Sequence, residues 1–469
     1  MIDKYRDKLD EEGVSPVIGV ILLVAVTVAI VALAMVIVFD IGSGVSDTSD
    51  ASVQMEQTDS GVQATIVRNE NVDEFILRHE DGTEKRSTKS IGSFTYDNGD
   101  GEYTLIGVVG GNEEVIGSKT VVGAESGESS SVIEVGNLTQ LQAMQGDLSA
   151  EYKLIRDIDA SETETWNNGQ GFNPIGSFTG SFDGQNNTIS NLSINRLDDN
   201  YVGLFGRIDS SAEVENVGVI NVNMTGSIRV GGLVGENYNG NISNSYSTGN
   251  VTGDKWYVGG LVGSNYGTVS NSYSTGNVTG ESYVGGLVGS NIYGNISNSY
   301  STGNVTGESN TVGGLVGYNY NGNISNSYST GNVSGEEQVG GLVGKNDNGN
   351  ISNSYSTGNV TGELYSVGGL LGSNSNNGTV SNSYATGSVS INSGSNVGGL
   401  LGISSSGSVS DSYWDIESTG QSSSAVLPDI NGLTTSEMQG SSAEGNMNFD
   451  FTSTWSTVEG DYPELQWQE

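Results

Sequence analysis

A near-identical unit of about 28 residues recurs through the second half of the chain and limits its possible folds more than any other feature. No unit contains ten consecutive residues of helix-forming sequence, and Gly and Asn are poor helix formers. Each unit instead contains three short strand-like pieces separated by Gly and Asn, which predicts one coil of a parallel β-solenoid per unit. The tripeptide Val-Gly-Gly begins at Val230, Val258, Val284, Val312, Val339, Val367 and Val397, at spacings of 28, 26, 28, 27, 28 and 30 residues.

Stacking explains why the same residue type returns at each position. Equivalent strands of successive coils pair about 4.8 Å apart, so equivalent side chains form columns. In the segment Asn-Ile-Ser-Asn-Ser-Tyr-Ser, period-two alternation places Ile, Asn and Tyr on one face and Ser on the other. We expect Ile and Tyr to face the core, Asn side chains to bond one another or turn backbone, and Ser to face solvent. Adjacent Leu233 and Val234 then require a bulge, a bend or a partner layer.

The N-terminal part contains one long apolar segment. Between Val14 and Phe39 there are 26 residues without a charge. A helix of this length spans roughly 39 Å, more than the hydrocarbon thickness of about 30 Å. We therefore predict a cytoplasmic leader at residues 1–13, a transmembrane helix at residues 14–40 and a location outside the cell for the rest of the chain.

The remaining sequence divides into four further parts. Alternating apolar residues and Asp-Gly turns predict a small antiparallel β-rich domain at residues 50–122. A polar linker follows at residues 123–131, then the solenoid at residues 132–420 and a C-terminal cap at residues 421–469. His79 lies in a strand-like run without a partner motif, so we expect a partly exposed histidine, and we interpret the basic residues near Arg78 as a solvated hairpin.

Composition excludes several functions. The chain has no Cys and one His, which excludes disulfides, thiol nucleophiles and multi-His metal sites. It has 55 acidic and 16 basic residues, a net charge of −39, which argues against nucleic acid as a partner and suits a very salty milieu. We predict no catalytic, cofactor or metal site. Asp183 and Asp415 are expected to cap turns. An enzyme with paired carboxylates acting on polysaccharide stays an alternative, because sequence does not reveal their separation.

Two groups of surface residues are candidates for modification or contact. Exposed aromatic residues in variable positions, able to stack on sugars or contact partners, are Trp256, Tyr257, Tyr283, Tyr318 and Tyr320. Asn-x-Ser/Thr sequences are acceptors for N-glycosylation on an extracellular protein, although the same letters belong to the repeat itself. The glycosylation candidates are Asn241, Asn250, Asn277, Asn295, Asn304, Asn323, Asn332, Asn350 and Asn359.

The sequence DEEGVSPVIGVILLVAVTVAIVALAMV, and above all SPVIGVIL from Ser15 to Leu22, resembles the N-terminus of haloarchaeal type IV pilins. The resemblance implies cleavage by a prepilin peptidase between Gly13 and Val14, followed by packing of the helix with other pilins in a filament. Glu12 departs from the Lys or Arg often found before the cleavage site. An uncut membrane anchor is the alternative.

The repeat array resembles the GLUG repeat family, whose Gly-Leu-x-Gly core corresponds to residues 232–235. The family's leading sequence is similar to residues 166–194, and its usual end is similar to residues 412–422 and 432–440. Members are large surface or secreted proteins with adhesive roles and no shared catalytic residues. The resemblance therefore implies a non-enzymatic surface adhesin or pilin-like protein in the cell membrane or a surface pilus, with a polysaccharide or protein ligand.

Overall fold

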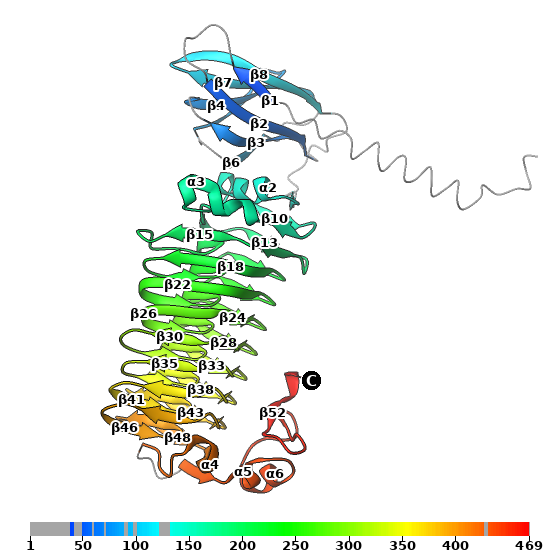
Figure 1. The fold of residues 1–469 in the computed structure, drawn as a ribbon. Helices are drawn as coiled ribbons and strands as arrows, with labels where there is room; N and C mark the ends of the chain where they lie inside the picture. Colours follow the sequence, from blue (N-terminus) through cyan, green and yellow to red (C-terminus); the bar gives the residue numbers. More distant parts are fainter. Residues whose placement is uncertain are drawn as a thin grey trace, which may run out of the picture. The chain divides into compact units, whose positions relative to one another are not determined.

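The computed structural model describes residues 38–41, 49–58, 61–69, 72–88, 92–96, 101–121, 132–425 and 430–468. They belong to two compact units, residues 1–131 and 132–469 (Figure 1). The predicted leader, the bond between Gly13 and Val14, the predicted helix as far as residue 37 and the linker at residues 123–131 lie outside the described residues. Residues 38–40, predicted as the helix end, are part of a strand. Within the described residues, no helix has the length and apolar character required to cross a membrane.

The first unit contains two four-stranded antiparallel sheets, which confirms the predicted small antiparallel β unit. Apolar residues of both sheets, among them Phe75, Phe94 and Leu105, form one hydrophobic cluster. The first sheet consists of β1 (Val38–Ile41), β2 (Ser49–Gln57), β3 (Val62–Asn69) and β6 (Gly92–Tyr96). The second consists of β5 (Glu84–Ser87), β4 (Glu74–His79), β7 (Gly101–Val109) and β8 (Asn112–Val121).

The single histidine is part of this core. His79 is only 7% exposed. The ring of His79 packs edge-on against Tyr103 with ring centroids 4.8 Å apart, and its Nδ1 lies 3.1 Å from Oδ1 of Asp81. The expected partly exposed position is therefore wrong, because β4 turns His79 toward the aromatic side of the sandwich.

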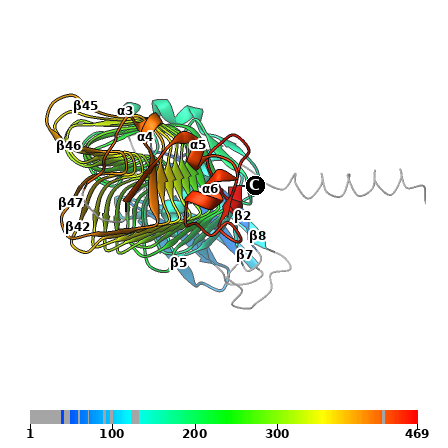
Figure 2. The same ribbon diagram turned by 90° about the horizontal axis from the view of Figure 1, so that it is seen from below.

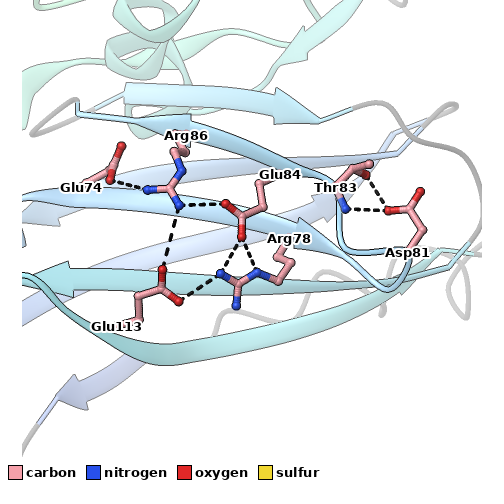
Figure 3. A network of polar contacts seen from close by, with 7 residues as sticks. All are labelled: Glu74, Arg78, Asp81, Thr83, Glu84, Arg86 and Glu113. Atoms are coloured by element: carbon pink, nitrogen blue, oxygen red, sulfur yellow. Dashed lines mark hydrogen bonds and ion pairs between the residues drawn. The ribbon is translucent and has the colours of Figure 1, made fainter.

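The basic hairpin next to it forms an ion-pair network (Figure 3). Glu84 accepts hydrogen bonds from Arg78 at 2.5 Å and from Arg86 at 2.8 Å. Arg78 also contacts Glu113, and Arg86 contacts Glu74. The hydrogen bonds from Arg78 and then Arg86 lower the pKa of the Glu84 carboxyl. Both arginines are thus paired with carboxylates on a partly exposed surface.

The second unit is a parallel β-solenoid of about nine turns, as the repeat predicts. Each coil contributes strands to three parallel sheets, which we call sheets I, II and III, and the coils stack along one axis (Figures 1 and 2). Sheet I contains the Asn-Ile-Ser pieces, sheet II the Tyr-Ser and Val-Thr-Gly pieces together with the Val-Gly that ends each coil, and sheet III the Val-Gly-x-Asn pieces.

The strand bounds follow the sequence repeat closely. Sheet I consists of β9 (Ile133–Val135), β10 (Glu151–Leu154), β13 (Ser181–Asp183), β17 (Glu213–Glu215), β21 (Asn241–Ser243), β24 (Thr268–Ser270), β28 (Asn295–Ser297), β33 (Asn323–Ser325), β38 (Asn350–Ser352), β43 (Thr379–Ser381) and β48 (Ser408–Ser410). Sheet III consists of β12 (Ile175–Phe178), β16 (Phe205–Ile208), β20 (Val234–Asn237), β23 (Val262–Asn265), β27 (Val288–Ile292), β32 (Val316–Tyr320), β37 (Val343–Asp347), β42 (Leu371–Ser375) and β47 (Leu401–Ser404).

Sheet II contains more and shorter strands because most coils enter it several times. It consists of β11 (Ile158–Asp159), β14 (Thr188–Ser190), β15 (Ser193–Arg196), β18 (Gly218–Gly226), β19 (Val230–Gly231), β22 (Tyr246–Gly259), β25 (Tyr273–Ser274), β26 (Asn277–Gly285), β29 (Tyr300–Ser301), β30 (Val305–Gly307), β31 (Val312–Gly313), β34 (Tyr328–Ser329), β35 (Val333–Gly335), β36 (Val339–Gly340), β39 (Tyr355–Ser356), β40 (Val360–Gly362), β41 (Tyr365–Gly368), β44 (Tyr384–Ala385), β45 (Val389–Ile391), β46 (Ser395–Gly398), β49 (Ser412–Asp415) and β50 (Ile430–Leu433).

Short helices lie in the first and last coils. In the first coils these are α2 (Leu138–Ala143), η2 (Met144–Gly146), η3 (Ser161–Thr165) and α3 (Trp166–Gly169). After the last coil come α4 (Ile416–Thr419), α5 (Thr435–Met438), α6 (Ser442–Asn446), the hairpin of β51 (Trp455–Ser456) and β52 (Glu464–Leu465), and η4 (Gln466–Gln468).

The corner between sheets I and II reverses the side-chain pattern that alternation predicts. Its Asn has φ close to +48° in each coil, as in Asn271 and Asn298, a left-handed conformation that Asn tolerates. This turn sends the following Ser into the core and the Tyr outward. Ile296 is buried as expected, but Ser299 is also buried and Tyr300 is partly exposed. The predictions of an inward Tyr column and an outward Ser face are therefore wrong, whereas the predicted Asn ladder is confirmed by the bond from Asn298 to Asn271 at 3.1 Å.

A bend in the backbone allows the adjacent Leu and Val of the repeat to pack in the core together. Gly232 and Leu233 lie in the corner between β19 of sheet II and β20 of sheet III, so Leu233 and Val234 both face the core from different sheets. Both are fully buried. The second Gly of the motif permits this corner, because a Cβ at Gly286 would lie 2.1 Å from the carbonyl oxygen of Gly314 in the next coil.

A second Asn ladder lies inside the solenoid and was not predicted. Asn265 of one coil donates through Nδ2 to Oδ1 of Asn291 at 2.7 Å, and Asn291 donates to Asn319 at 2.8 Å. Asn291 also donates to the carbonyl of Gly294 at 3.0 Å in its own turn. All members are fully buried, so each coil satisfies its polar turn only with the help of the next coil.

The two buried serines of each coil predict opposite mutational effects. Oγ of Ser299 donates to the carbonyl of Ser297 at 2.7 Å and accepts from the backbone N–H of Ser272 at 3.2 Å. Oγ of Ser301 has no hydrogen-bond partner among the described residues, and Ala385 takes the same column position in a later coil. We expect Ser299→Ala to lower the free energy of unfolding by about 1–2 kcal/mol, and Ser301→Ala to leave it unchanged or raise it. Urea denaturation of both variants measures this, and an equal loss in both would contradict it.

Candidate binding face

The outer sides of the three sheets differ in how strictly they repeat. Sheet I presents Asn or Thr and Ser in almost every GLVG-containing coil, and sheet II presents the Tyr column and an Asn column. The outward positions of sheet III change from coil to coil although the backbone does not. Sheet II also varies in the segment that follows each Val-Thr-Gly piece, as at Trp256 and Tyr365, which are 47% and 50% exposed.

Three adjacent columns form the changing surface, which we call the variable face. Column a precedes each Val of the Val-Gly-Gly motif, column b is the residue x of Val-Gly-x-Asn, and column c follows that Asn. Column a contains Arg229, Tyr257, Tyr283, Thr311 and Gln338. Column b contains Arg207, Glu236, Ser264, Ser290, Tyr318, Lys345 and Ser373, of which Glu236 and the three serines are buried. Column c contains Tyr238, Tyr266, Ile292, Tyr320 and Asp347.

Column a holds large side chains in a conformation that they rarely adopt. Arg229, Tyr257, Tyr283 and Thr311 have φ between +56° and +65°. At the corner between sheets I and II, by contrast, the residue in this left-handed conformation is Asn in the six coils from Asn244 to Asn382. A strained residue of this kind costs of order 1–3 kcal/mol and tends to mark functional surfaces. The retained strain therefore distinguishes column a from an ordinary solvated corner.

Charged residues at the first coils of the variable face are paired and stacked. Glu236 lies between Arg229, at 2.9 Å, and Arg207, at 3.3 Å. The guanidinium of Arg207 lies 4.4 Å from the ring centroid of Tyr238, and that of Arg229 lies 5.5 Å from the ring of Tyr257. These cation–π contacts place both guanidinium groups over aromatic rings.

Tyrosines fill the middle of the variable face. Ring centroids are 5.3 Å apart between Tyr257 and Tyr283 and 5.4 Å apart between Tyr283 and Tyr318. At the later end, Nζ of Lys345 lies 5.5 Å from the ring of Tyr318 and 3.3 Å from Oδ2 of Asp347. Burial and then the nearby Asp347 carboxylate raise the pKa of the Tyr318 hydroxyl. The structure thus brings four of the five predicted aromatic residues together, and the fifth, Trp256, lies beside them and is 47% exposed.

All nine glycosylation candidates are exposed, and none lies on the variable face. One group lies on sheet I and the other on sheet II. Within a column their amides bond one another, as Asn323 donates to Asn295 at 2.9 Å. Exposure agrees with the predicted acceptor role, which stays a prediction. On sheet I the candidates are Asn241, Asn295, Asn323 and Asn350, and on sheet II they are Asn250, Asn277, Asn304, Asn332 and Asn359.

Carboxylates that sequence suggested as turn caps have that role. Oδ1 of Asp183 accepts from the backbone N–H of Gln185 at 2.9 Å and from Nδ2 of Asn216 at 3.0 Å. Asp415 caps α4 through the N–H groups of Glu417 and Ser418. Although burial opposes it, these bonds and those from the Thr435 and Tyr462 hydroxyls lower the pKa of the Asp415 carboxyl. In the described part of the chain, no group of three or more His, Cys, Asp or Glu is arranged to hold a metal ion.

The outward Tyr column is the second aromatic surface. Tyr246, Tyr273 and Tyr300 stack with centroids 4.7 Å apart and rings within 7° of parallel. Further along, the C-terminal segment folds back over the column and buries it. Tyr384 is 1% exposed, and its hydroxyl donates to the carbonyl of Pro463 at 2.6 Å. The indole N–H of Trp467 donates to the carbonyl of Asn326 at 3.0 Å. Residues 430–468 therefore cover one side of the last coils. The sequence predicted this segment only as a C-terminal cap.

Comparison with known proteins supports the repeat assignment. The sequence profile of the GLUG motif matches residues 226–252, 255–279, 280–306, 308–334, 335–361 and 363–390. Six coils of the solenoid match the GLUG motif. In each, the motif supplies the inward Ile or Val of sheet I, the left-handed Asn corner and the outward Tyr, so the motif encodes one turn of the solenoid.

A curated relative and solved structures are similar to the chain, and two of these structures carry the name of an immunoglobulin A1 protease. Halomucin of Haloquadratum walsbyi is 43% identical over 157 residues, which cover 31% of this chain but only 2% of halomucin. A candidate immunoglobulin A1 protease of Bacteroides ovatus aligns over 73% of this chain and 94% of its own, with 22% identity and a TM-score of 0.45. An IgA1 protease aligns over 70% of this chain and 27% of its own, with 16% identity and a TM-score of 0.36. The GLUG motifs and halomucin support a repetitive surface protein.

The Tyr column of the GLUG coils predicts a loss of stability at alkaline pH. Burial raises the pKa of Tyr273 and of Tyr328 to about 12, compared with about 10 in an unfolded chain. The stability contributed by the neutral phenols is fully present below about pH 10 and is lost as pH rises through about 12. Phenolate absorbance and circular dichroism should change together in that interval. The variant with Tyr273→Phe and Tyr328→Phe should unfold at higher pH, and an unchanged midpoint would contradict the assignment.

Proposed function

We propose that the chain is a non-enzymatic cell-surface protein whose solenoid mediates attachment or contact between cells. The observation that carries this proposal is the variable face. The variable face concentrates Tyr and Arg in strained or stacked positions, for example Tyr257, Tyr283 and Arg207. Tyr, Trp and Arg are the residues that contribute most to protein recognition, since they bury large rigid surfaces at low entropic cost.

Further features agree with a location outside the cell. The relative is named halomucin, which denotes a mucin-like protein, and the chain has exposed glycosylation acceptors on two sheets. A net charge of −39 maintains solubility where salt screens repulsion. In this proposal the chain lies in the cell membrane with its C-terminal part outside, and its ligand is a surface polysaccharide or protein.

The N-terminal segment connects the display surface to the cell in this proposal. The apolar segment at residues 14–37 lies in the membrane, a prepilin peptidase cleaves between Gly13 and Val14, and the freed helix packs with other pilins. The second candidate is an uncut anchor that never enters a filament, favoured by Glu12 before the cleavage site.

Intact-mass measurement of the protein from the cell envelope tests the anchor. A chain that begins at Val14 supports pilin-type processing, and a chain that retains Met1 in the membrane fraction supports the uncut anchor. Recovery of the full-length chain from the cytosol would contradict a surface role altogether.

Cell attachment tests the display surface. We expect the variant with Tyr257→Ser, Tyr283→Ser and Tyr318→Ser to lower chain-dependent aggregation or surface attachment by roughly tenfold, as loss of central aromatic contacts does in other interfaces. The matched control replaces Asn323 on sheet I with Ser and should attach normally. Equal attachment by both variants at equal surface abundance would contradict the proposal. Release of reducing ends from polysaccharide by the purified protein would instead assign it to the enzymes.

A further inference from the structure

We propose that the uncovered part of the Tyr column on sheet II is a second binding site, and that it takes an extended peptide segment of another protein. The segment has a proline and a tryptophan spaced as Pro463 and Trp467 are in this chain. The contact between the column and the chain's own C-terminal segment carries this inference. The site uses no residue of the variable face, so it is independent of the proposed function.

The C-terminal segment shows how a peptide binds the hydroxyl groups of the column. The carbonyl of Pro463 accepts a hydrogen bond from the hydroxyl of Tyr384 at 2.6 Å. One coil earlier, Nε2 of Gln468 donates to the hydroxyl of Tyr355 at 2.9 Å. Phenol hydroxyls of adjacent coils thus bind a main-chain carbonyl and a side-chain amide of one short segment.

A tryptophan completes this contact. The indole ring of Trp467 lies against Tyr328 and Tyr300, with ring centroids 5.9 and 6.4 Å apart. Its N–H donates to the carbonyl of Asn326 at 3.0 Å. The residues from Pro463 to Gln468 therefore contact the tyrosines of four successive coils, the last of them, Tyr300, only through the indole ring.

The earlier coils of the column offer the same groups again. The tyrosines pair in register, so a shift of three coils places Tyr300, Tyr273 and Tyr246 where Tyr384, Tyr355 and Tyr328 lie. The corner carbonyl is repeated as well, because Asn244 and Asn326 both have a φ of +48°. Equivalent strands are about 4.8 Å apart. A segment with the contacts of Pro463–Gln468 therefore finds its partners at the same spacing in the earlier coils.

The tyrosines of these earlier coils are available to a partner. Tyr246, Tyr273 and Tyr300 are partly exposed, and within the described residues no hydrogen bond joins their hydroxyls to another residue. Their ring faces are not available, since each ring stacks on the next with centroids 4.7 Å apart. A sugar that stacks on an aromatic side chain needs an open ring face. The free edges and hydroxyls therefore favour peptide carbonyls and amides over a glycan.

The free stretch of the column has the length of the segment. The chain's own segment ends beside the middle coils of the solenoid (Figure 1), where Trp467 reaches Tyr300. The column continues for two coils beyond Tyr300, to Tyr273 and Tyr246, and stops where Gly218 takes the place of Tyr. The number of tyrosines with unbound hydroxyls therefore equals the number that Pro463–Gln468 contact in addition to Tyr300.

Binding at this site does not depend on charge. The outer positions two residues before and two residues after each free tyrosine are all Asn or Thr. They are Asn244, Asn271, Asn298, Thr248, Thr275 and Thr302. Salt screens ion pairs but maintains apolar contacts, which kosmotropic salts strengthen. We therefore expect the affinity to persist at the high ionic strength that suits a net charge of −39.

A synthetic peptide with the sequence of residues 462–468, Tyr-Pro-Glu-Leu-Gln-Trp-Gln, is the probe. We expect saturable binding to the full-length protein in detergent, measured by fluorescence anisotropy at low and at molar salt. The variant with Tyr273→Phe and Tyr300→Phe keeps the stacked rings but lacks two hydroxyls, and should raise the dissociation constant roughly tenfold. The variant with Tyr257→Phe and Tyr283→Phe on the variable face is the matched control and should bind the peptide with unchanged affinity.

A second control distinguishes the free column from its covered part. The variant with Tyr355→Phe and Tyr384→Phe lacks the hydroxyls that bind the chain's own segment, and should leave the affinity for the peptide unchanged. Circular dichroism verifies the fold of each variant. An effect in this variant as large as that of Tyr273→Phe with Tyr300→Phe would mean that the peptide only displaces the C-terminal segment, which would overturn the proposal. Absence of peptide binding would overturn it too, as would a neutral polysaccharide probe whose binding requires the Tyr273 and Tyr300 hydroxyls.

Discussion

In-register parallel pairing between successive coils is the constraint on which the second unit depends. Each strand satisfies its backbone groups only through the equivalent strand before and after it, so every side chain is placed against its own counterpart. A residue is acceptable when it is compatible with a copy of itself one coil away. Apolar side chains, amide ladders and stacked phenols meet that condition, whereas a column of like charges does not. The scarcity of charged residues in the repeats follows from this requirement.

Departures from the repeat are informative for the same reason. Where stacking dictates the residue, as for Ile296 in the core or Asn291 in the internal ladder, successive coils agree. On the variable face, stacking would accept Ser throughout, yet Arg, Glu, Tyr and Lys appear instead. They are accommodated by pairing with different residues in adjacent coils, as Glu236 pairs with Arg207. Selection for something other than coil stability explains a surface of this kind, which is why we place the function there.

The C-terminal segment shows how a regular column ends. The stacked tyrosines present an apolar edge along sheet II, and residues 430–468 cover its later part with Trp455, Phe449 and Leu465. At the other end of the column, Gly218 takes the place of Tyr in the preceding coil and leaves room for the ring of Tyr246. Side chains of the C-terminal segment thus cover the later end of the Tyr column. At its first end, the preceding coil has Gly218 and therefore no side chain in the column.

The sequence by itself determined the solenoid, its period, the columns and the small antiparallel unit. Strand pieces that repeat about every 28 residues, with Gly and Asn turns between them, bury their apolar side chains by stacking on the equivalent pieces of the next unit. It also identified four aromatic residues of the variable face, Tyr257, Tyr283, Tyr318 and Tyr320, but not Tyr238 or Tyr266. It did not show that they lie together, since Tyr283 and Tyr318 are 35 positions apart. Only the tertiary structure decided that Ser, and not Tyr, faces the core after the corner between sheets I and II. A single left-handed Asn at the corner, such as Asn298, inverts the alternation that a straight strand would impose, and no count of residues along the chain reveals that sign change. The fold-back of Trp467 onto Asn326 is likewise a contact across 141 positions, fixed by packing and not by local pattern.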